Sequence, residues 1–239
     1  MKSNGMKVSI ASAALAVGIF FAGAVFAQVL DFEGLKDQEA VLNYYSGGLG
    51  GGGSGPGPNF GITFTPNSMA IIESDFGGSG NFKGEPSPKT ILFFLSGPAA
   101  TMNVPAGFST GFSFFYSAAS SPGVIRVWSG LNATGVLLAT LNLPATGSGA
   151  AIPACNAKTF CPFFPFGVTF SGVAQSVDFG GTINQIGFDQ VTLGSSNPGG
   201  GGNGPPSTIP TLNEWAVLTL IGLLAIAGLF AIRRGQALG

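Results

Sequence analysis

Histidine is absent from the 239 residues, and cysteine occurs only twice. Without an imidazole, the chain cannot form a Ser–His–Asp or Cys–His catalytic centre, a histidine zinc site or a histidine pH switch. Charge is scarce as well: 8% of the residues are charged, against about 25% in an average globular protein. The stretch 28–208 carries five basic and nine acidic residues, so no basic surface is available to neutralise nucleic-acid phosphates. A nucleic-acid partner is therefore excluded.

The N-terminus has the features of a secretory signal peptide. Lys2 and Lys7 precede an apolar stretch over 8–26, and small residues stand at positions −3 and −1 of a cleavage site after Ala27. The pattern predicts a signal peptide over 1–27 and export across the inner membrane. The alternative is an uncleaved anchor helix.

The C-terminus has an apolar span followed by positive charge. Residues 215–232 include no charged side chain, and as a helix they would extend roughly 27 Å, close to the roughly 30 Å of a bilayer core. Arg233 and Arg234 follow directly, which places the tail in the cytoplasm by the positive-inside rule. Trp215 stands where an interfacial aromatic residue belongs. We expect one transmembrane helix over 215–232.

A short motif, Ile209-Pro210-Thr211-Leu212, precedes Trp215. Together with the apolar span and the terminal arginines, it resembles the IPTL-CTERM sorting signal, a relative of the PEP-CTERM signal of Gram-negative bacteria. This chain has Ala216 where the usual pattern has Gly. The resemblance implies that an exosortase-type membrane protease processes the tail. Pro210 favours the extended backbone that a protease cleft requires.

The segment 195–208 is rich in Gly, Pro and Ser, which is typical of a flexible tether. The chain therefore divides into a signal peptide (1–27), an ectodomain (28–194), a linker (195–208) and a sorting signal (209–239).

The ectodomain has the hydrophobic pattern of short strands. Apolar or alternating runs are bounded by Gly, Pro and Asn, and no segment between the two ends sustains a helical period. The runs cover 90–95, 112–117, 124–128, 136–143, 168–170, 176–179 and 186–193. This rhythm predicts an all-β fold, an antiparallel β-sandwich or jelly roll.

Two other segments depart from that rhythm. Residues 35–45 could hold one short helix at most. Residues 46–59 are nearly all Gly, Ser and Pro, and we expect a long mobile surface loop there.

Several phrases of the ectodomain are similar to those of exported PEP-CTERM-type proteins. They are Asp31-Phe32-Glu33-Gly34, Gly80-Asn81-Phe82 with Glu85-Pro86-Ser87-Pro88, Phe112-Ser113-Phe114-Phe115-Tyr116, and the stretch 188–194. The resemblance implies a jelly-roll sandwich related to carbohydrate-binding domains. It implies an architecture and no particular reaction.

Cys155 and Cys161 lie close together in a loop rich in Pro and Phe. Since an exported protein meets an oxidising compartment, we expect them to form a disulfide. The alternative is a reactive free pair.

Three carboxylates form a candidate calcium site. Asp31 and Glu33 fall on the first expected strand and Asp189 on the last, and terminal strands of jelly rolls often pair, so their oxygens could bind a structural Ca²⁺. The alternative is that they are solvated edge residues that discourage association between sheets. No other cofactor is expected. Paired carboxylates could also serve a glycosidase, but no sugar-binding pattern accompanies them, and we expect no enzyme.

Exposed aromatic residues would be needed for sugar binding. Tyr44 and Tyr45, beside the Gly-rich segment, and Trp128 are the candidates, although the apolar strand around Trp128 favours core packing. The leading hypothesis is a non-enzymatic protein of the cell surface or extracellular matrix, sorted by its tail. The alternative is a surface-displayed carbohydrate-binding module, with an extracellular polysaccharide as its partner.

Replacing Pro210 and Thr211 with Ala should leave export and membrane insertion unchanged but block processing, so that full-length protein accumulates in the inner membrane. Fractionation with an antibody against the ectodomain, in hosts with and without the matching exosortase, measures this. If mutant and wild type distribute identically in both hosts, the motif is only a linker next to the membrane.

Overall fold

The computed structural model describes residues 27–199, and the predicted signal peptide and sorting signal lie almost entirely outside this range. Within it, the strands are β1 (Gln28–Leu30), β2 (Glu39–Ala40), β3 (Thr63–Phe64), β4 (Ser68–Ile72), β5 (Thr90–Phe94), β6 (Ala99–Ser117), β7 (Gly123–Gly130), β8 (Thr134–Leu143), β9 (Phe164–Gly181) and β10 (Gly187–Leu193). Three short 3₁₀ turns are present: η1 (Ser74–Phe76), η2 (Gly149–Ala151) and η3 (Pro153–Cys155). None of the helices in 27–199 is long and apolar enough to span a membrane.

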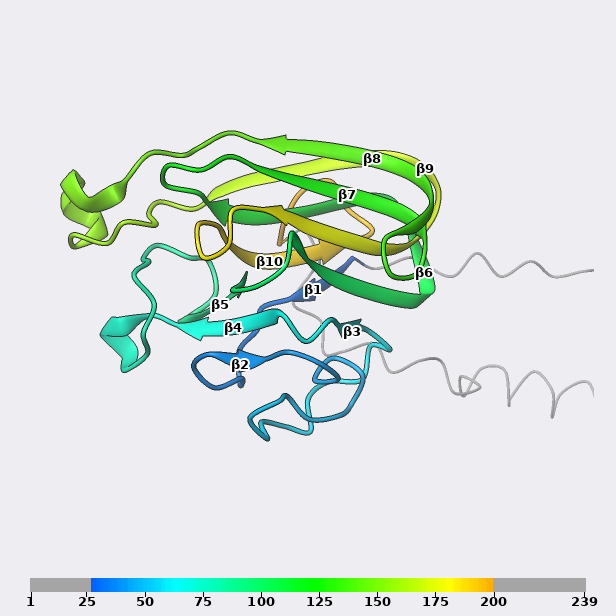
Figure 1. The fold of residues 1–239 in the computed structure, drawn as a ribbon, viewed down its shortest axis with the longest axis horizontal. Helices are drawn as coiled ribbons and strands as arrows, with labels where there is room; N and C mark the ends of the chain where they lie inside the picture. Colours follow the sequence, from blue (N-terminus) through cyan, green and yellow to red (C-terminus); the bar gives the residue numbers. More distant parts are fainter. Residues whose placement is uncertain (1–26, 200–239) are drawn as a thin grey trace, which may run out of the picture.

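All strand pairs are antiparallel, in the order β2-β4-β5-β10-β6-β9-β7-β8, with β1 on β10 and β3 on β6. The strands at the two ends of this order, β2 and β8, lie at opposite sides of the molecule (Figure 1). We call β2, β4, β5, β10 and β1, with the second half of β6 and the first half of β9, the first layer. The second layer is β3, the first half of β6, the second half of β9, β7 and β8. The predicted antiparallel β-sandwich is confirmed.

The long strands β6 and β9 belong to both layers because they bend together. Their pairing is regular over Ala99–Asn103 and again over Thr110–Tyr116, with register shifts between. At the bend, Gly107 and Gly172 have φ angles of +73° and +96°, which glycine adopts without the steric cost of a Cβ. A Cβ on Gly107 would also lie 2.4 Å from Val173 Cγ1. The bend therefore needs glycine at this position.

Phenylalanine fills the space between the layers. Phe179 of the second layer lies 5.0 Å from Phe188 and 6.0 Å from Phe112 of the first layer, measured between ring centroids, and Phe114 lies 5.5 Å from Phe188. The four side chains are fully buried, and the rings meet at inclined angles that suit their quadrupoles. The alternation of Phe112 and Phe114 predicted from sequence thus directs both rings into the core.

The core runs from the first strand to the last. Leu30 of β1 and Leu193 of β10 pack in the same cluster as Ile125 of β7 and Leu141 of β8. The core of the described residues therefore spans both layers, and we expect 27–199 to fold by itself.

The Gly-rich segment 46–59 differs from the prediction of a mobile loop, because it is fixed around the buried carboxylate of Glu39. Gly52 and Ser54 donate their backbone N–H groups to Glu39 Oε1 at 2.6 and 3.0 Å. Burial opposes ionisation, but these bonds, the Ser54 hydroxyl and the Lys36 N–H outweigh it and lower the pKa of Glu39. A Cβ at Gly50 would lie 2.5 Å from Glu39 Oε1, so the lack of side chains permits this close approach.

The strands expected from sequence are present, and the two runs at 168–170 and 176–179 are parts of the single bent strand β9. A first strand was expected to carry Asp31 and Glu33, but β1 ends at Leu30 and both residues follow it. Strands β2 to β4 were not predicted, and β2 and β3 have only two residues each. No helix forms over 35–45, which contains turns and the short strand β2.

Phe188→Ala should lower the free energy of unfolding of residues 28–199 by about 3–5 kcal/mol, because it removes a buried ring and leaves a cavity between the layers. Urea unfolding followed by circular dichroism measures the change. Val136→Ala, at a site that is 66% exposed, is the control and should shift stability by less than about 0.5 kcal/mol. A loss below about 1 kcal/mol for Phe188→Ala would contradict the packing described here.

Candidate functional site

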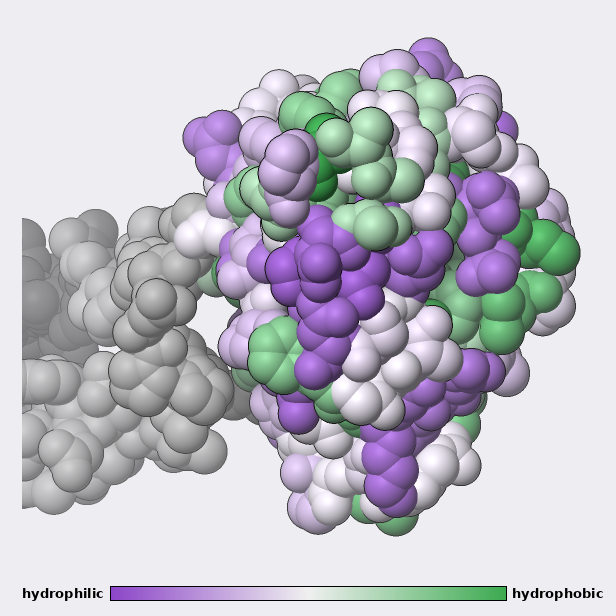
Figure 2. All heavy atoms as spheres, turned by 90° about the vertical axis from the view of Figure 1, so that its left-hand side faces the viewer, coloured by the Kyte–Doolittle hydropathy of each residue, from purple (hydrophilic) through white to green (hydrophobic). Residues whose placement is uncertain are grey.

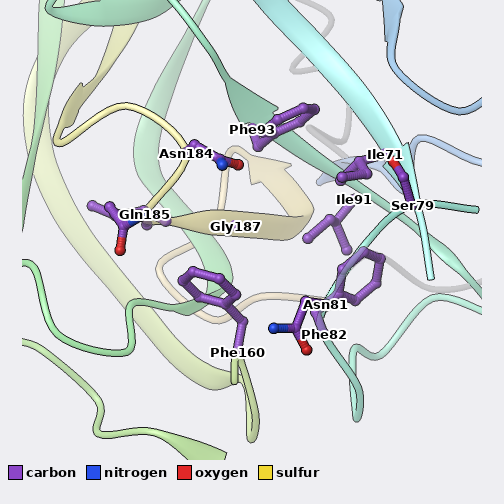
Figure 3. A pocket seen from close by; sticks show the side chains of 11 residues that line it. Ile71, Ser79, Asn81, Phe82, Ile91, Phe93, Phe160, Asn184, Gln185 and Gly187 are labelled. Carbon is purple, nitrogen blue, oxygen red and sulfur yellow. The ribbon is translucent and has the colours of Figure 1, made fainter. Parts of the chain in front are cut away.

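A pocket of about 220 Å³ opens on the outer face of the first layer. It is lined by Ile71, Ser79, Asn81, Phe82, Ile91, Phe93, Phe160, Asn184, Gln185, Ile186 and Gly187. Figure 3 shows these side chains around the space, with Asn184 and Gln185 on one side and Ile71, Ile91 and Phe82 on the other. The loops that carry several of them lie with η1, η2 and η3 at one end of the molecule, away from the start of β1 (Figure 1). Figure 2 faces this end, where hydrophilic residues form a band between hydrophobic ones.

The floor of the pocket is the outer side of β4, β5 and β10. Alternation along β5 sends Leu92 and Phe94 into the main core, and Ile91 into a second cluster with Phe82 and Phe163. A Cβ at Gly187 would lie 2.5 Å from Ile91 Cδ1. The glycine therefore lets Ile91 lie across β10.

One wall joins two loops that are far apart in sequence. Phe82, after β4, forms a parallel β-bridge with Phe160, which precedes β9. Beside it, Asn81 Nδ2 donates to Thr159 Oγ1 at 2.9 Å, and the Thr159 N–H donates to Asn81 Oδ1 at 3.1 Å. The amide of Asn81 thus holds the wall together.

Ion pairs connect the same two loops. Asp75 accepts Lys158 Nζ at 2.7 Å and Lys83 Nζ at 2.9 Å, and Lys83 also pairs with Glu73 at 3.1 Å. The hydrogen bonds from Lys158 and then Lys83 lower the pKa of the Asp75 carboxyl well below its usual range.

The predicted disulfide is confirmed. Cys155 and Cys161 are joined, with their Cα atoms 5.8 Å apart. Cys161 follows Phe160 directly in the chain, so the covalent link restrains the residue that forms the wall.

Two residues with carboxamide side chains, Asn184 and Gln185, line the pocket from the β9–β10 turn. Asn184 is held by its backbone N–H, which donates to Phe94 O at 2.9 Å, and has a φ of +56°, a conformation that Asn tolerates better than most residues. Within 27–199, the side-chain amides of Asn184 and Gln185 make no hydrogen bond to the protein. Each amide offers donors and an acceptor to a molecule in the pocket.

A cluster of buried carboxyls lies behind the loop 82–89. Both oxygens of Glu85 are shielded from solvent and have no hydrogen-bond partner among the described residues. Burial raises the pKa of Glu85 to about 8, and the negative charges of Glu73 and Asp189 add to the rise. Burial likewise raises the pKa of Asp189 to about 7, although Ser87 donates its N–H and its hydroxyl to that carboxylate at 2.7 and 2.8 Å.

A larger hollow of about 650 Å³ lies around Gln28 and Gly194, where the described chain enters β1 and leaves β10. Its lining is mostly apolar, with Phe60, Ile62 and Phe108. The site between the two loops, which combines aromatic rings with several carboxamide side chains, is the candidate.

The prediction that Tyr44 and Tyr45 could be exposed ligand-binding residues is wrong. They are 8% and 1% exposed and pack against each other in the main core. The Tyr45 hydroxyl accepts the Phe32 N–H at 2.6 Å, and the Tyr44 hydroxyl donates to Glu33 O at 2.9 Å. Both phenols thus satisfy backbone groups as the chain turns after β1.

Trp128 is not a core residue, contrary to the expectation from its apolar strand. Ile125 and Val127 point into the core, whereas Trp128 is half-buried on the opposite face of β7. Its indole N–H donates to Asp178 Oδ2 at 3.1 Å, and Arg126 lies 3.6 Å from the other carboxylate oxygen. Trp128 does not line the pocket.

The expected pairing of the first and last strands is present, since β1 pairs with β10. The three candidate calcium ligands nevertheless do not form one group, and 27–199 contains no cluster of three or more acidic or cysteine side chains suited to a metal. Glu33 instead accepts the backbone N–H groups of Lys89 and Thr90, at 2.9 and 2.8 Å. Asp189 is fully buried and bonded to Ser87, and Asp31 is exposed. Glu33 and Asp189 thus anchor the loop before β5, and neither is a solvated edge residue.

The residues that line the pocket were not identified as a site from the sequence. Asn81 and Phe82 occur in a phrase noted there, and Phe160 lies in the cysteine loop, but no spacing connects them with Asn184 and Gln185. A run of two amides in a turn between strands carries little signal by itself.

No family model and no curated protein matches this sequence. Among solved structures, the chain is similar to the K2 cleaved adhesin domain of Lys-gingipain (12% identity, TM-score 0.45, covering 71% of this chain and 99% of that one). It is similar also to the carbohydrate-binding module CBM6cm-2 of Cellvibrio mixtus lichenase 5A in complex with cellotriose (12%, TM-score 0.31, 54% and 87%). A third is CsCBM6-3 of Clostridium stercorarium in complex with cellobiose (19%, TM-score 0.32, 53% and 93%). These are partial likenesses of fold and assign no function to this chain.

The domain should lose stability as pH rises. The pKa of Glu85 is about 8 in the folded protein, against 4.5 for an unperturbed Glu, so between these values the folded state binds more protons than the unfolded one. The stabilising contribution of the neutral acid is complete below pH 4.5 and is lost as pH rises through about 8. Glu85→Gln, which imitates the neutral acid, should reduce the fall in Tm between pH 5 and pH 9.

Asp75→Asn is the control, because the pKa of Asp75 is lowered and its charge does not change in this interval. Thermal melts followed by circular dichroism give both slopes. An unchanged slope in Glu85→Gln would show that this carboxyl is ionised throughout.

Proposed function

We propose that this chain is an exported, surface-displayed binding module that takes a neutral sugar residue in the pocket between the two braced loops. The observation that carries the proposal is the combination of aromatic rings and unpaired carboxamides around one open space. Phe82, Phe93 and Phe160 supply apolar surface, and Asn184 and Gln185 supply hydrogen-bonding groups. Ligand sites generally combine an apolar and aromatic lining with a few placed polar groups.

The absence of charge from the lining supports a neutral ligand. No residue of the pocket lining carries an acid, a base or a thiol, so an ionic ligand would find no charged partner there. The one hydroxyl of the lining, that of Ser79, accepts a hydrogen bond from Gln38 Nε2 at 2.7 Å, and the lining contains no base that could activate it as a nucleophile. A sugar ring offers hydroxyl groups that both donate and accept, which matches the two carboxamides. Binding without catalysis is the function that this chemistry supports.

The size of the pocket supports a single sugar residue. Its volume of about 220 Å³ is below the roughly 300–1,000 Å³ of pockets for drug-sized molecules. We therefore infer that the site takes one residue of a glycan, such as a chain end or a side branch.

Display at the cell surface rests on the two ends of the sequence. The signal peptide over 1–27 would export the chain, and the sorting signal over 209–239 would present it to an exosortase-type enzyme in the inner membrane. The pocket lies at the end of the domain away from the start of β1 (Figure 1). Strand β10 ends beside the start of β1, so a chain attached through its C-terminal tail could present the pocket outwards.

A glycan array with residues 28–199, followed by titration calorimetry on the selected glycan, tests the binding function. Phe160→Ala and the double change Asn184→Ala with Gln185→Ala should each weaken binding by at least about tenfold, equivalent to about 1.4 kcal/mol. Phe76→Ala is the matched control, because Phe76 is 59% exposed on a neighbouring turn outside the pocket. Thermal melts confirm that the variants fold.

Two outcomes would overturn the proposal. One is the absence of binding to any neutral glycan. The other is binding that Trp128→Ala abolishes and the pocket variants leave intact, which would place the site on the outer face of β7.

A further inference from the structure

We infer that strand β8 is a self-association edge, through which two copies of this chain join their second layers into one continuous antiparallel sheet. The inference is independent of the proposed sugar site. It rests on the position of β8, on its exposure and on its lack of charge and proline.

Strand β8 is the last strand of its layer. Its ten residues pair with β7 on one side, and no strand of 27–199 pairs with the other side. Over Leu137–Leu143, no backbone group forms a hydrogen bond outside the β7 pairing among the described residues. In an antiparallel pair, alternate residues direct N–H and C=O groups away from the partner, so β8 presents a row of free groups at its outer side.

The other sheet edges carry the devices that usually prevent edge pairing. Strands β2 and β3 have only two residues each. The first half of β9, which ends the first layer, contains Pro165, which has no N–H to donate. The long β8 differs from all of these.

Strand β8 is long and is protected by neither charge nor proline. Its sequence, Thr134 to Leu143, contains no charged residue and no proline. Val136 and Leu137 are 66% and 45% exposed, whereas exposed edges usually carry charges, especially Lys. The pairing with β7 has two register shifts, one on each side of Trp128. Both lie in the first half of β8 and leave Ala139–Leu143 in regular register with β7.

A second copy of this chain is the partner that the chemistry fits. An isologous interface requires a surface that is complementary to itself, and an antiparallel pair of identical strands meets this requirement by a twofold axis. Like charges directly opposite each other would oppose such pairing, but over 129–177 the only charged residue is Lys158, which is bound to Asp75 near the pocket. A charged partner would find no group to recognise on β8.

Sedimentation equilibrium of residues 28–199, from low micromolar to several hundred micromolar, tests the inference. The wild type should show a concentration-dependent doubling of mass, and hydrogen exchange should show that β8 amides become protected as the dimer forms. The double variant Thr140→Lys with Asn142→Lys changes two exposed positions that lie opposite each other when Ala139–Leu143 of two copies pair about Leu141. It places like charges across the twofold axis and should weaken dimerisation by at least about tenfold. Val136→Lys, at another exposed position of β8, is a second variant.

Val173→Lys is the control, since Val173 is 57% exposed but lies on β9, and it should dimerise as the wild type does. Circular dichroism and Tm establish that each variant is folded. A wild type that stays monomeric throughout, or a dimer that both β8 variants leave intact, would overturn the inference. Glycan titration of the double variant separates this result from the sugar site, because β8 does not line the pocket.

Discussion

The pairing of β6 with β9 is the interaction on which the rest of the fold depends, because these two strands pass from one layer to the other. Their ladder runs from Ala99↔Gly180 to Tyr116↔Phe164, with one bend. Before the bend the pair supports β3 and β7, and after it the pair supports β10. Because β6 and β9 contribute to both layers, the layers are joined covalently, and Phe112, Phe114, Phe179 and Phe188 pack together between them. Loss of the bend would separate the two faces of the core.

The few charged side chains of the first layer have a structural role. Its charged groups anchor loops rather than cover the surface. Glu39 holds the Gly-rich segment, Glu33 and Asp189 hold the loop before β5, and Asp75 joins Lys83 to Lys158. Each carboxylate accepts several donors, which offsets the cost of burying it. The loops thus become rigid walls, and a rigid wall binds a ligand with less loss of conformational entropy.

The same scarcity of charge leaves strand β8, at the edge of the second layer, without a charged side chain. Soluble proteins usually protect long sheet edges with charges, prolines or short strands, and β8 has none of these. A pocket at one end and an unprotected edge along one side are separate surfaces. A paired molecule could present two pockets at once, and two linked sites raise the effective affinity for a repetitive ligand.

The sequence by itself determined the all-β fold class, the positions of strands in β5 to β8 and β10, and the disulfide. The strands depend on local hydrophobic alternation, and the disulfide depends on two cysteines that are close in the chain. The export and sorting signals at the ends were predicted from sequence and lie almost wholly outside the described residues. Only the tertiary structure decided the rest. Tyr44 and Tyr45 became core residues because the Gly-rich segment folds back over them, and Trp128 faced outwards because β7 alternates about Ile125 and Val127. The pocket unites residues from 71 to 187, and no local pattern encodes such a site, because contacts between distant segments arise only when the sheet closes.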